Sequence, residues 1–240
     1  SGIGGLIVSA IDFDDSEDPG IKIQNSPVSQ EQTDSIKIVR SQAVTFHSPI
    51  QLDTGYAKYI IPVGQVNLEK KEKTDYQVRT KKKYYSSNSR RNSFYGLFNN
   101  FIFYDQSSEF KSRIFEDKVA ITDWSYLNIQ EKELLIFKGT SDDTNLDNQL
   151  NKSDYQSLFV YYMADKRLIP YNFKNKTVLE FEPMLKTNFI SIKVGVDKDK
   201  NLEYESNSEP QEILILDVNN RLVTNFISNE MKEELQNKVD

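Results

Sequence analysis

The chain contains no cysteine and only one histidine, His47, among its 240 residues. Zinc sites built on cysteine, thiolate nucleophiles and metal clusters held by several histidines are therefore excluded. A glycine-rich phosphate loop is also missing, because the one glycine cluster, Gly2 to Gly5, precedes strand-like residues. The sequence carries no motif that identifies a reaction, so we expect neither a cofactor nor a metal site.

The composition indicates a folded β protein. Hydrophobic residues make up 38% and aromatic residues 12% of the chain, which is too aromatic for a disordered protein. Thirteen tyrosines and fourteen phenylalanines favour strands, because aromatic rings fit a pleated, half-buried surface. The formal net charge of −6 excludes a globally basic coat for nucleic acid. Frequent Lys, Asn, Ser, Tyr and Ile are typical of an AT-rich genome and favour a bacterial source.

Residues 1–34 differ in composition from the rest of the chain. The run 3–11 is apolar and uncharged, but it is too short to span a bilayer, which takes about 20 residues. It predicts either a first strand or the trailing end of a membrane segment or signal sequence. Residues 12–34 are acidic and turn-rich, which indicates a linker. We therefore expect an apolar segment and acidic linker at 1–34, a β-rich domain at 35–227 and a C-terminal helix at 228–240.

Short runs that alternate apolar and polar residues predict half-buried strands in the domain. The expected strands cover 36–40, 43–47, 56–63, 101–104, 118–121, 133–137, 157–163, 177–181, 189–196, 202–205, 212–218 and 222–226. Pro62 predicts an edge position or a strand end, because proline donates no ladder hydrogen bond. Residues 197–201 are typical of a hairpin turn. Ser228 is a suitable N-cap for a helix over 229–238, with apolar residues at helical spacing.

These patterns give a mainly β fold class, an antiparallel sandwich or partly open barrel with a C-terminal α-helix.

The basic stretch 69–91 is the strongest local signal, with nine basic residues against three acidic ones and interleaved tyrosines. Such a stretch could bind an anionic membrane surface or protein, or single-stranded nucleic acid by phosphate pairing and base stacking. A solvated hairpin without a partner is the simpler interpretation. The overall negative charge makes nucleic acid the least favoured of these partners. The residues expected to contact a partner are Lys70, Lys71, Lys73, Arg79, Lys81, Lys82, Lys83, Tyr84, Tyr85, Arg90 and Arg91.

The loop 143–154 places acidic and amide residues at several positions of an EF-hand calcium loop. However, Asn148 stands where the pattern needs glycine, Asp154 stands where it needs glutamate, and the flanks do not resemble two amphipathic helices. We therefore favour a plain polar loop over a calcium site.

No catalytic arrangement is recognisable in the sequence. His47 lies at an expected strand end without an acidic residue nearby to orient it, and Trp124 is interpreted as a core anchor. We therefore expect a non-enzymatic binding or scaffolding domain of a larger, membrane-associated assembly, in a membrane-associated or extracytoplasmic location. One alternative is a carbohydrate-active enzyme that uses carboxylates alone. A second alternative is a nucleic-acid-binding module that uses residues 69–91.

Overall fold

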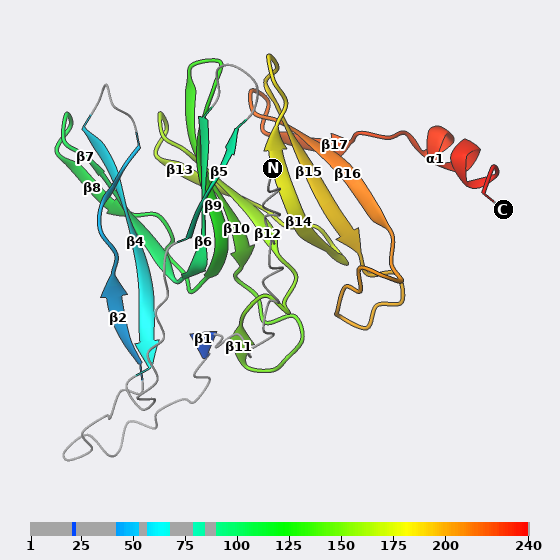
Figure 1. Cartoon of the computed structure of the whole chain (residues 1–240), viewed down its shortest axis with the longest axis horizontal. Helices are drawn as coiled ribbons and strands as arrows, with labels where there is room; N and C mark the ends of the chain where they lie inside the picture. Colours follow the sequence, from blue (N-terminus) through cyan, green and yellow to red (C-terminus); the bar gives the residue numbers. More distant parts are fainter. Residues whose placement is uncertain (1–20, 23–41, 53–56, 68–78, 85–89, 240) are drawn as a thin grey trace, which may run out of the picture.

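The computed structural model describes residues 21–22, 42–52, 57–67, 79–84 and 90–239. These residues form antiparallel strands and one helix, arranged as three sheets that lie next to one another (Figure 1). The N-terminal sheet contains β2 (Gln42–Phe46), β3 (Ile50–Gln51), β4 (Lys58–Asn67), β7 (Asn100–Asp105) and β8 (Phe110–Arg113). The central sheet has the order β13 (Arg167–Tyr171), β12 (Ser157–Tyr162), β10 (Lys132–Thr140), β9 (Ala120–Ile129), β6 (Arg90–Phe98) and β5 (Arg79–Tyr84). The C-terminal sheet has the order β14 (Lys176–Pro183), β15 (Phe189–Val196), β16 (Gln211–Asp217) and β17 (Leu222–Asn225).

A short fourth pairing joins β1 (Ile21–Lys22) to β11 (Gln149–Leu150). Ile21 is buried in a small cluster with Ala120 and Leu150. Two residues of the segment interpreted as a linker therefore contact the domain. The expected strand 36–40 and the rest of the segment 1–34 lie outside the described residues.

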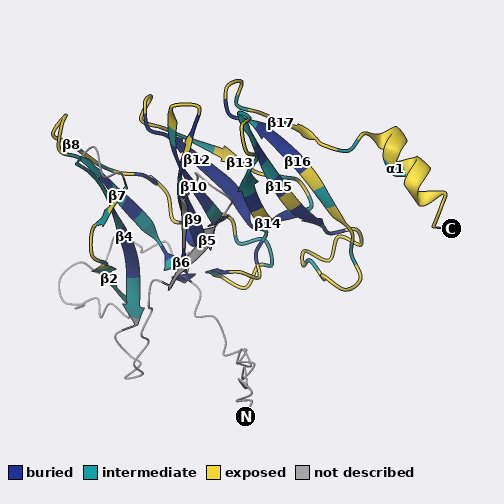
Figure 2. Ribbon diagram, turned by 45° about the horizontal axis from the view of Figure 1, so that its top comes forward, coloured by how far each residue is buried: buried dark blue, intermediate teal, exposed yellow. Residues whose placement is uncertain are grey.

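The central sheet is covered on both faces. In β10, Leu135 and Phe137 pack into the core shared with the N-terminal sheet, whereas Leu134 and Ile136 pack into the core shared with the C-terminal sheet. All six residues of β12 are buried, and the central strands form the dark interior of Figure 2. Burying one such side chain contributes about 1.5–3 kcal/mol, so these two strands anchor both cores.

Trp124 lies in the first of these cores with no exposed surface. Its ring stacks on Phe94 with 4.2 Å between the ring centroids and meets the edge of Phe101 at 5.6 Å. The interpretation of Trp124 as a core anchor is confirmed.

Pro62 lies inside β4, which has neighbours on both sides. Its carbonyl accepts a hydrogen bond of 3.0 Å from the backbone N–H of His47, in the break between β2 and β3. The backbone nitrogen and carbonyl of a strand residue point to the same side, so the missing N–H also faces this break. The proline is tolerated because the ladder is interrupted there, which gives β4 an edge at this one residue.

The predicted fold class is confirmed: the described chain is mainly β, antiparallel, with a C-terminal helix. Helix α1 (Asn229–Gln236) begins after Ser228, whose hydroxyl accepts a 3.2 Å hydrogen bond from the N–H of Met231. The hairpin expected around 197–201 is wrong, because β15 pairs with β14 and β16. The chain instead forms a loop over 197–210, whose conformation is set by buried and half-buried carboxylates described below.

Candidate functional site

The basic stretch is only partly described. Lys70, Lys71 and Lys73 lie in 68–78, and Tyr85 lies in 85–89, both outside the described residues. The remaining predicted contact residues belong to β5 and to the start of β6, which pair as a hairpin. Strand β5 is the last strand of the central sheet at this side. The backbone register pairs Lys83 with Arg91.

The loop 143–154 is organised by its own carboxylates. Asp154, with 1% of its surface exposed, accepts backbone N–H bonds from Thr144 at 2.7 Å and from Asn151 at 2.9 Å. Asp143 accepts the N–H of Asn148 at 2.8 Å. Burial raises the pKa of Asp154, and these N–H donors offset part of that rise. These carboxylates face N–H donors and hold the loop closed.

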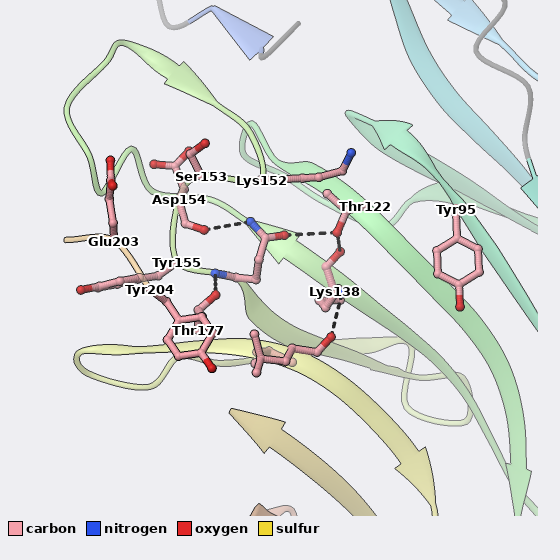
Figure 3. A pocket seen from close by; sticks show the side chains of 13 residues that line it. Tyr95, Thr122, Lys138, Lys152, Ser153, Asp154, Tyr155, Thr177, Glu203 and Tyr204 are labelled. Carbon is pink, nitrogen blue, oxygen red and sulfur yellow. Dashed lines mark hydrogen bonds between the residues drawn. The ribbon is translucent and has the colours of Figure 1, made fainter. Parts of the chain in front are cut away.

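A pocket of about 450 Å³ lies where the loop 152–156 and the central sheet meet the C-terminal sheet (Figure 3). Its floor is polar and fixed by hydrogen bonds. The Gln156 side chain donates to the carbonyl of Asn151 at 3.0 Å and accepts from the hydroxyl of Thr122 at 3.2 Å. The N–H of Gln156 donates to the hydroxyl of Thr177 at 2.9 Å. Lys138 crosses to the C-terminal sheet and donates to the carbonyl of Leu179 at 2.9 Å.

Three tyrosines line the same pocket. Tyr95 lies on one side, whereas Tyr155 and Tyr204 lie together on the other side (Figure 3). The Tyr204 ring packs flat on the backbone of Gly195, because a Cβ added there would lie 2.5–2.7 Å from three ring atoms. The Tyr204 hydroxyl also accepts a 2.8 Å hydrogen bond from Gln211. This ring is therefore held in one orientation.

The loop 197–210 fixes the positions of Tyr155 and Tyr204. Asp197, with 2% exposure, accepts hydrogen bonds from the Tyr155 hydroxyl and from the N–H groups of Lys200 at 2.6 Å and Leu202 at 3.1 Å. Burial alone would raise the pKa of Asp197, but these donors bring it below its usual value. Burial and the neighbouring Asp197 raise the pKa of Tyr155, so its phenol stays protonated at neutral pH.

Asp197 also lies close to Asp199 and Glu209, and together they form an acidic cluster. Each of the three already accepts a backbone N–H: Glu209, for example, accepts that of Lys198 at 2.6 Å. These bonds explain why the loop replaces the hairpin that the sequence predicted.

Helix α1 projects from the C-terminal sheet as an arm, and its own residues are coloured mainly as exposed in Figure 2. No residue of α1 is buried. Met231, Leu235 and Val239 are 51%, 54% and 81% exposed, and Phe226 just before the helix is 53% exposed. We call these four residues the apolar stripe; Met231 and Leu235 lie within α1, whereas Phe226 precedes the helix and Val239 follows it.

The arm is tethered by Lys232, which donates to Glu212 at 2.8 Å, while Glu212 also binds Lys176 at 2.6 Å. Together these two lysines lower the pKa of Glu212.

His47 follows β2 and is half-buried. Its ring meets the edge of Phe98 at 5.6 Å, and burial lowers its pKa. His47 therefore makes an apolar contact within the N-terminal part of the domain.

No protein-family model, curated protein or solved structure matches the chain significantly. Among the residues that the structure describes, no helix has the length and apolar character needed to cross a membrane.

The sequence-based reasoning missed the residues that form the pocket. Thr122, Lys138, Gln156, Thr177 and Tyr204 come from five separate segments, and none belongs to a local motif. Tyr155 directly follows the polar loop 143–154, and no local pattern in the sequence indicates that its ring lines a pocket.

Proposed function

We propose that this chain is a non-enzymatic binding or scaffolding domain of a larger, membrane-associated assembly, and that α1 inserts into a protein partner. The observation that carries the proposal is the apolar stripe. An isolated helix of eight residues is marginal in water, because helices shorter than about 12–15 residues do not offset the cost of nucleation. A partner that buries the stripe would supply the missing stabilisation, as in other complexes in which a helix fills a groove.

The charges of α1 indicate the chemistry of that partner. Glu230, Glu233 and Glu234 are exposed around the helix, whereas Lys232 is already bound to Glu212. Helices that lie on anionic membranes carry basic residues on their polar face, so the acidic face of α1 disfavours this role. We therefore propose an apolar groove flanked by lysines or arginines on a partner protein.

Photo-cross-linking of the full chain in its host cells tests this docking mode. A photoreactive amino acid at position 231 or 235 should give one discrete adduct. Position 233 is the matched control, because it lies about 200° around the helix from position 231. Peptide mapping should place the cross-linked site of the partner in an apolar groove with basic residues at its rim. An adduct with a second copy of the chain, equal adducts from position 233, or no adduct would overturn the proposal.

The basic hairpin is proposed as a second contact, for an acidic protein surface or an anionic membrane. Replacing Lys81, Lys82 and Lys83 with Glu is expected to abolish flotation with phosphatidylserine vesicles or co-purification with the partner, while the far-ultraviolet circular dichroism stays unchanged. Binding that persists in the variant would remove the hairpin from the contact surface. A binding constant for single-stranded DNA that falls steeply with salt would instead support the nucleic-acid alternative.

The alternative of a carbohydrate-active enzyme requires two carboxyl groups about 5–10 Å apart across a cleft. The carboxyl groups that line the pocket belong to Asp154 and Glu203. Both oxygens of Asp154 accept backbone N–H bonds, which favours a structural role over proton transfer. Release of reducing sugar from an oligosaccharide by the purified chain would support the enzyme instead.

A further inference from the structure

The pocket between the central and C-terminal sheets has the size and lining of a ligand site. Its volume of about 450 Å³ falls within the range of about 300–1,000 Å³ that is typical of small-molecule sites. It differs from an accidental gap because its polar floor and its aromatic walls are both fixed by contacts within the domain. A site that is ordered before binding avoids part of the entropic cost of ordering side chains around a ligand.

The aromatic walls offer flat apolar surfaces. The Tyr204 ring packs on the Gly195 backbone, and its hydroxyl accepts a hydrogen bond from the Gln211 side chain. The Tyr155 hydroxyl donates a hydrogen bond to Asp197. Tyr95 lies on the opposite side, so a ligand between them could meet aromatic rings on two sides (Figure 3). Tyrosine combines an apolar ring with a polar hydroxyl, and therefore suits ligands that have both kinds of surface.

The floor offers hydrogen-bonding groups without a dominant charge. The hydroxyl of Thr177 accepts the N–H of Gln156, and a hydroxyl in that position keeps its own proton to donate. The lining contains two lysines, Lys138 and Lys152, and two acidic residues, Asp154 and Glu203, so it has no net preference for an anion or a cation. These properties select a neutral ligand.

We propose that this pocket binds a neutral carbohydrate chain. A pyranose ring presents an apolar C–H face that stacks on tyrosine, and its hydroxyl groups both donate and accept hydrogen bonds. Tyr204 and Tyr155 would hold one sugar face, while Thr177 and Lys138 would contact hydroxyl groups at the floor. This inference goes beyond the docking of α1, because it concerns a different face of the domain and a different class of ligand.

Binding of defined oligosaccharides to the full chain tests the proposal. Cellotetraose, xylotetraose, maltotetraose and chitotetraose would each be titrated by calorimetry, with a hyaluronan tetrasaccharide as the charged comparison. We expect at least one neutral tetrasaccharide to bind in preference to the charged one. Tyr204→Ala should weaken this binding about tenfold, as expected for the loss of one aromatic stacking contact. Tyr104→Ala is the matched control, because Tyr104 stacks on Tyr59 in the N-terminal sheet, and it should leave the affinity unchanged.

A second measurement uses the unmodified chain, so the proposal stays falsifiable if Tyr204→Ala does not fold. Saturation of tyrosine ring protons in the nuclear magnetic resonance spectrum should transfer to protons on the C–H face of the bound sugar. Tyr204→Phe keeps the ring and should retain binding. The proposal is overturned if no neutral tetrasaccharide binds at 10 mM or below, on the order of the weakest specific affinities. Preference for the charged sugar or equal affinity in Tyr204→Ala would also overturn it.

Discussion

Replacement of Asp197 by asparagine should destabilise the domain by about 2 kcal/mol. The Asp197 carboxylate is buried and accepts three hydrogen bonds, from the N–H groups of Lys200 and Leu202 and from the hydroxyl of Tyr155. An asparagine keeps one acceptor oxygen, so its NH₂ group must face at least one of these donors. A hydrogen bond to a charged group contributes about 1.5–3 kcal/mol, and a buried donor without a partner costs about 1–3 kcal/mol. Relaxation of the loop recovers part of this sum, which gives the expected loss.

Guanidinium unfolding followed by the fluorescence of Trp124 measures the loss. Trp124 is the only tryptophan and is fully buried, so its emission reports the opening of the core. Asp199→Asn is the matched control, because Asp199 is exposed and accepts the N–H of Asn201 at 3.1 Å in the same loop. Its substitution should change the stability by about 0.5 kcal/mol or less, as is usual for surface residues. Equal losses in the two variants, or none in Asp197→Asn, would refute the role of burial.

The pH dependence gives an independent check of the same carboxylate. The folded state lowers the pKa of Asp197 below 3.8, so the unfolded state binds more protons in the window between the two values. The stability that the carboxylate contributes is therefore complete above the unfolded pKa and is lost as the pH falls through the folded pKa. The difference between wild type and Asp197→Asn should shrink in this acidic window. A difference that stays constant down to the acid limit of folding would contradict the assignment.

Three further predictions follow from single contacts. Gly139→Ala should cost about 1–3 kcal/mol in guanidinium unfolding, because the new Cβ would lie 2.2 Å from the carbonyl oxygen of Ala120. Gly64→Ala should cost less, because the nearest atom to its new Cβ is in the His47 side chain at 3.2 Å. The pKa of His47, measured by nuclear magnetic resonance, should lie below 6.5. Stability should rise with pH between this folded pKa and 6.5, because the unfolded state binds more protons there. A measured pKa of 6.5 or higher would contradict the burial of His47. Glu212→Gln should speed amide exchange throughout α1 at pH 7 and have less effect in acid. The folded state lowers the pKa of Glu212, so the stability from its ion pairs is complete above pH 4.5 and is lost as the pH falls through the folded pKa. Unchanged exchange would show that these ion pairs do not hold the helix.

Strands β2, β4, β7, β10, β12 and β14 to β17 were predicted from their runs of apolar residues, whereas β5, β6, β8 and β13 were not. The runs 133–137 and 157–163 were predicted as strands, but their nearly continuous apolar character also indicates burial on both faces. Alternate residues of each run do point into different cores. The helix was predictable from Ser228 and the helical spacing of Met231, Leu235 and Val239. The apolar runs therefore indicate that β10 and β12 are central strands, which the prediction of half-buried strands overlooked.

The loop 197–210 was not predictable from local pattern. Residues 202–205 alternate like a strand, but Asp197 and Glu209 capture the N–H groups that a ladder would need. Which donor a carboxylate reaches depends on the fold of a dozen residues and not on spacing. The pocket was not predictable from the sequence for the same reason, because its lining residues come together only when the two sheets pack.

The three stacked sheets constrain where any partner can bind. Both faces of the central sheet are covered, so the buried apolar side chains of β10 and β12 are inaccessible for contacts. Three accessible places are the candidates for a partner: the edge strand β5, the pocket between the central and C-terminal sheets, and the arm α1. These three places differ in chemistry. The sequence of β5 is rich in cationic residues, the pocket offers hydroxyl and tyrosine groups, and the arm carries the apolar stripe. Because these places are separate, an oligosaccharide bound in the pocket should leave cross-linking from position 235 unchanged. A loss of cross-linking would require that binding in the pocket is coupled to α1 through β14 to β17.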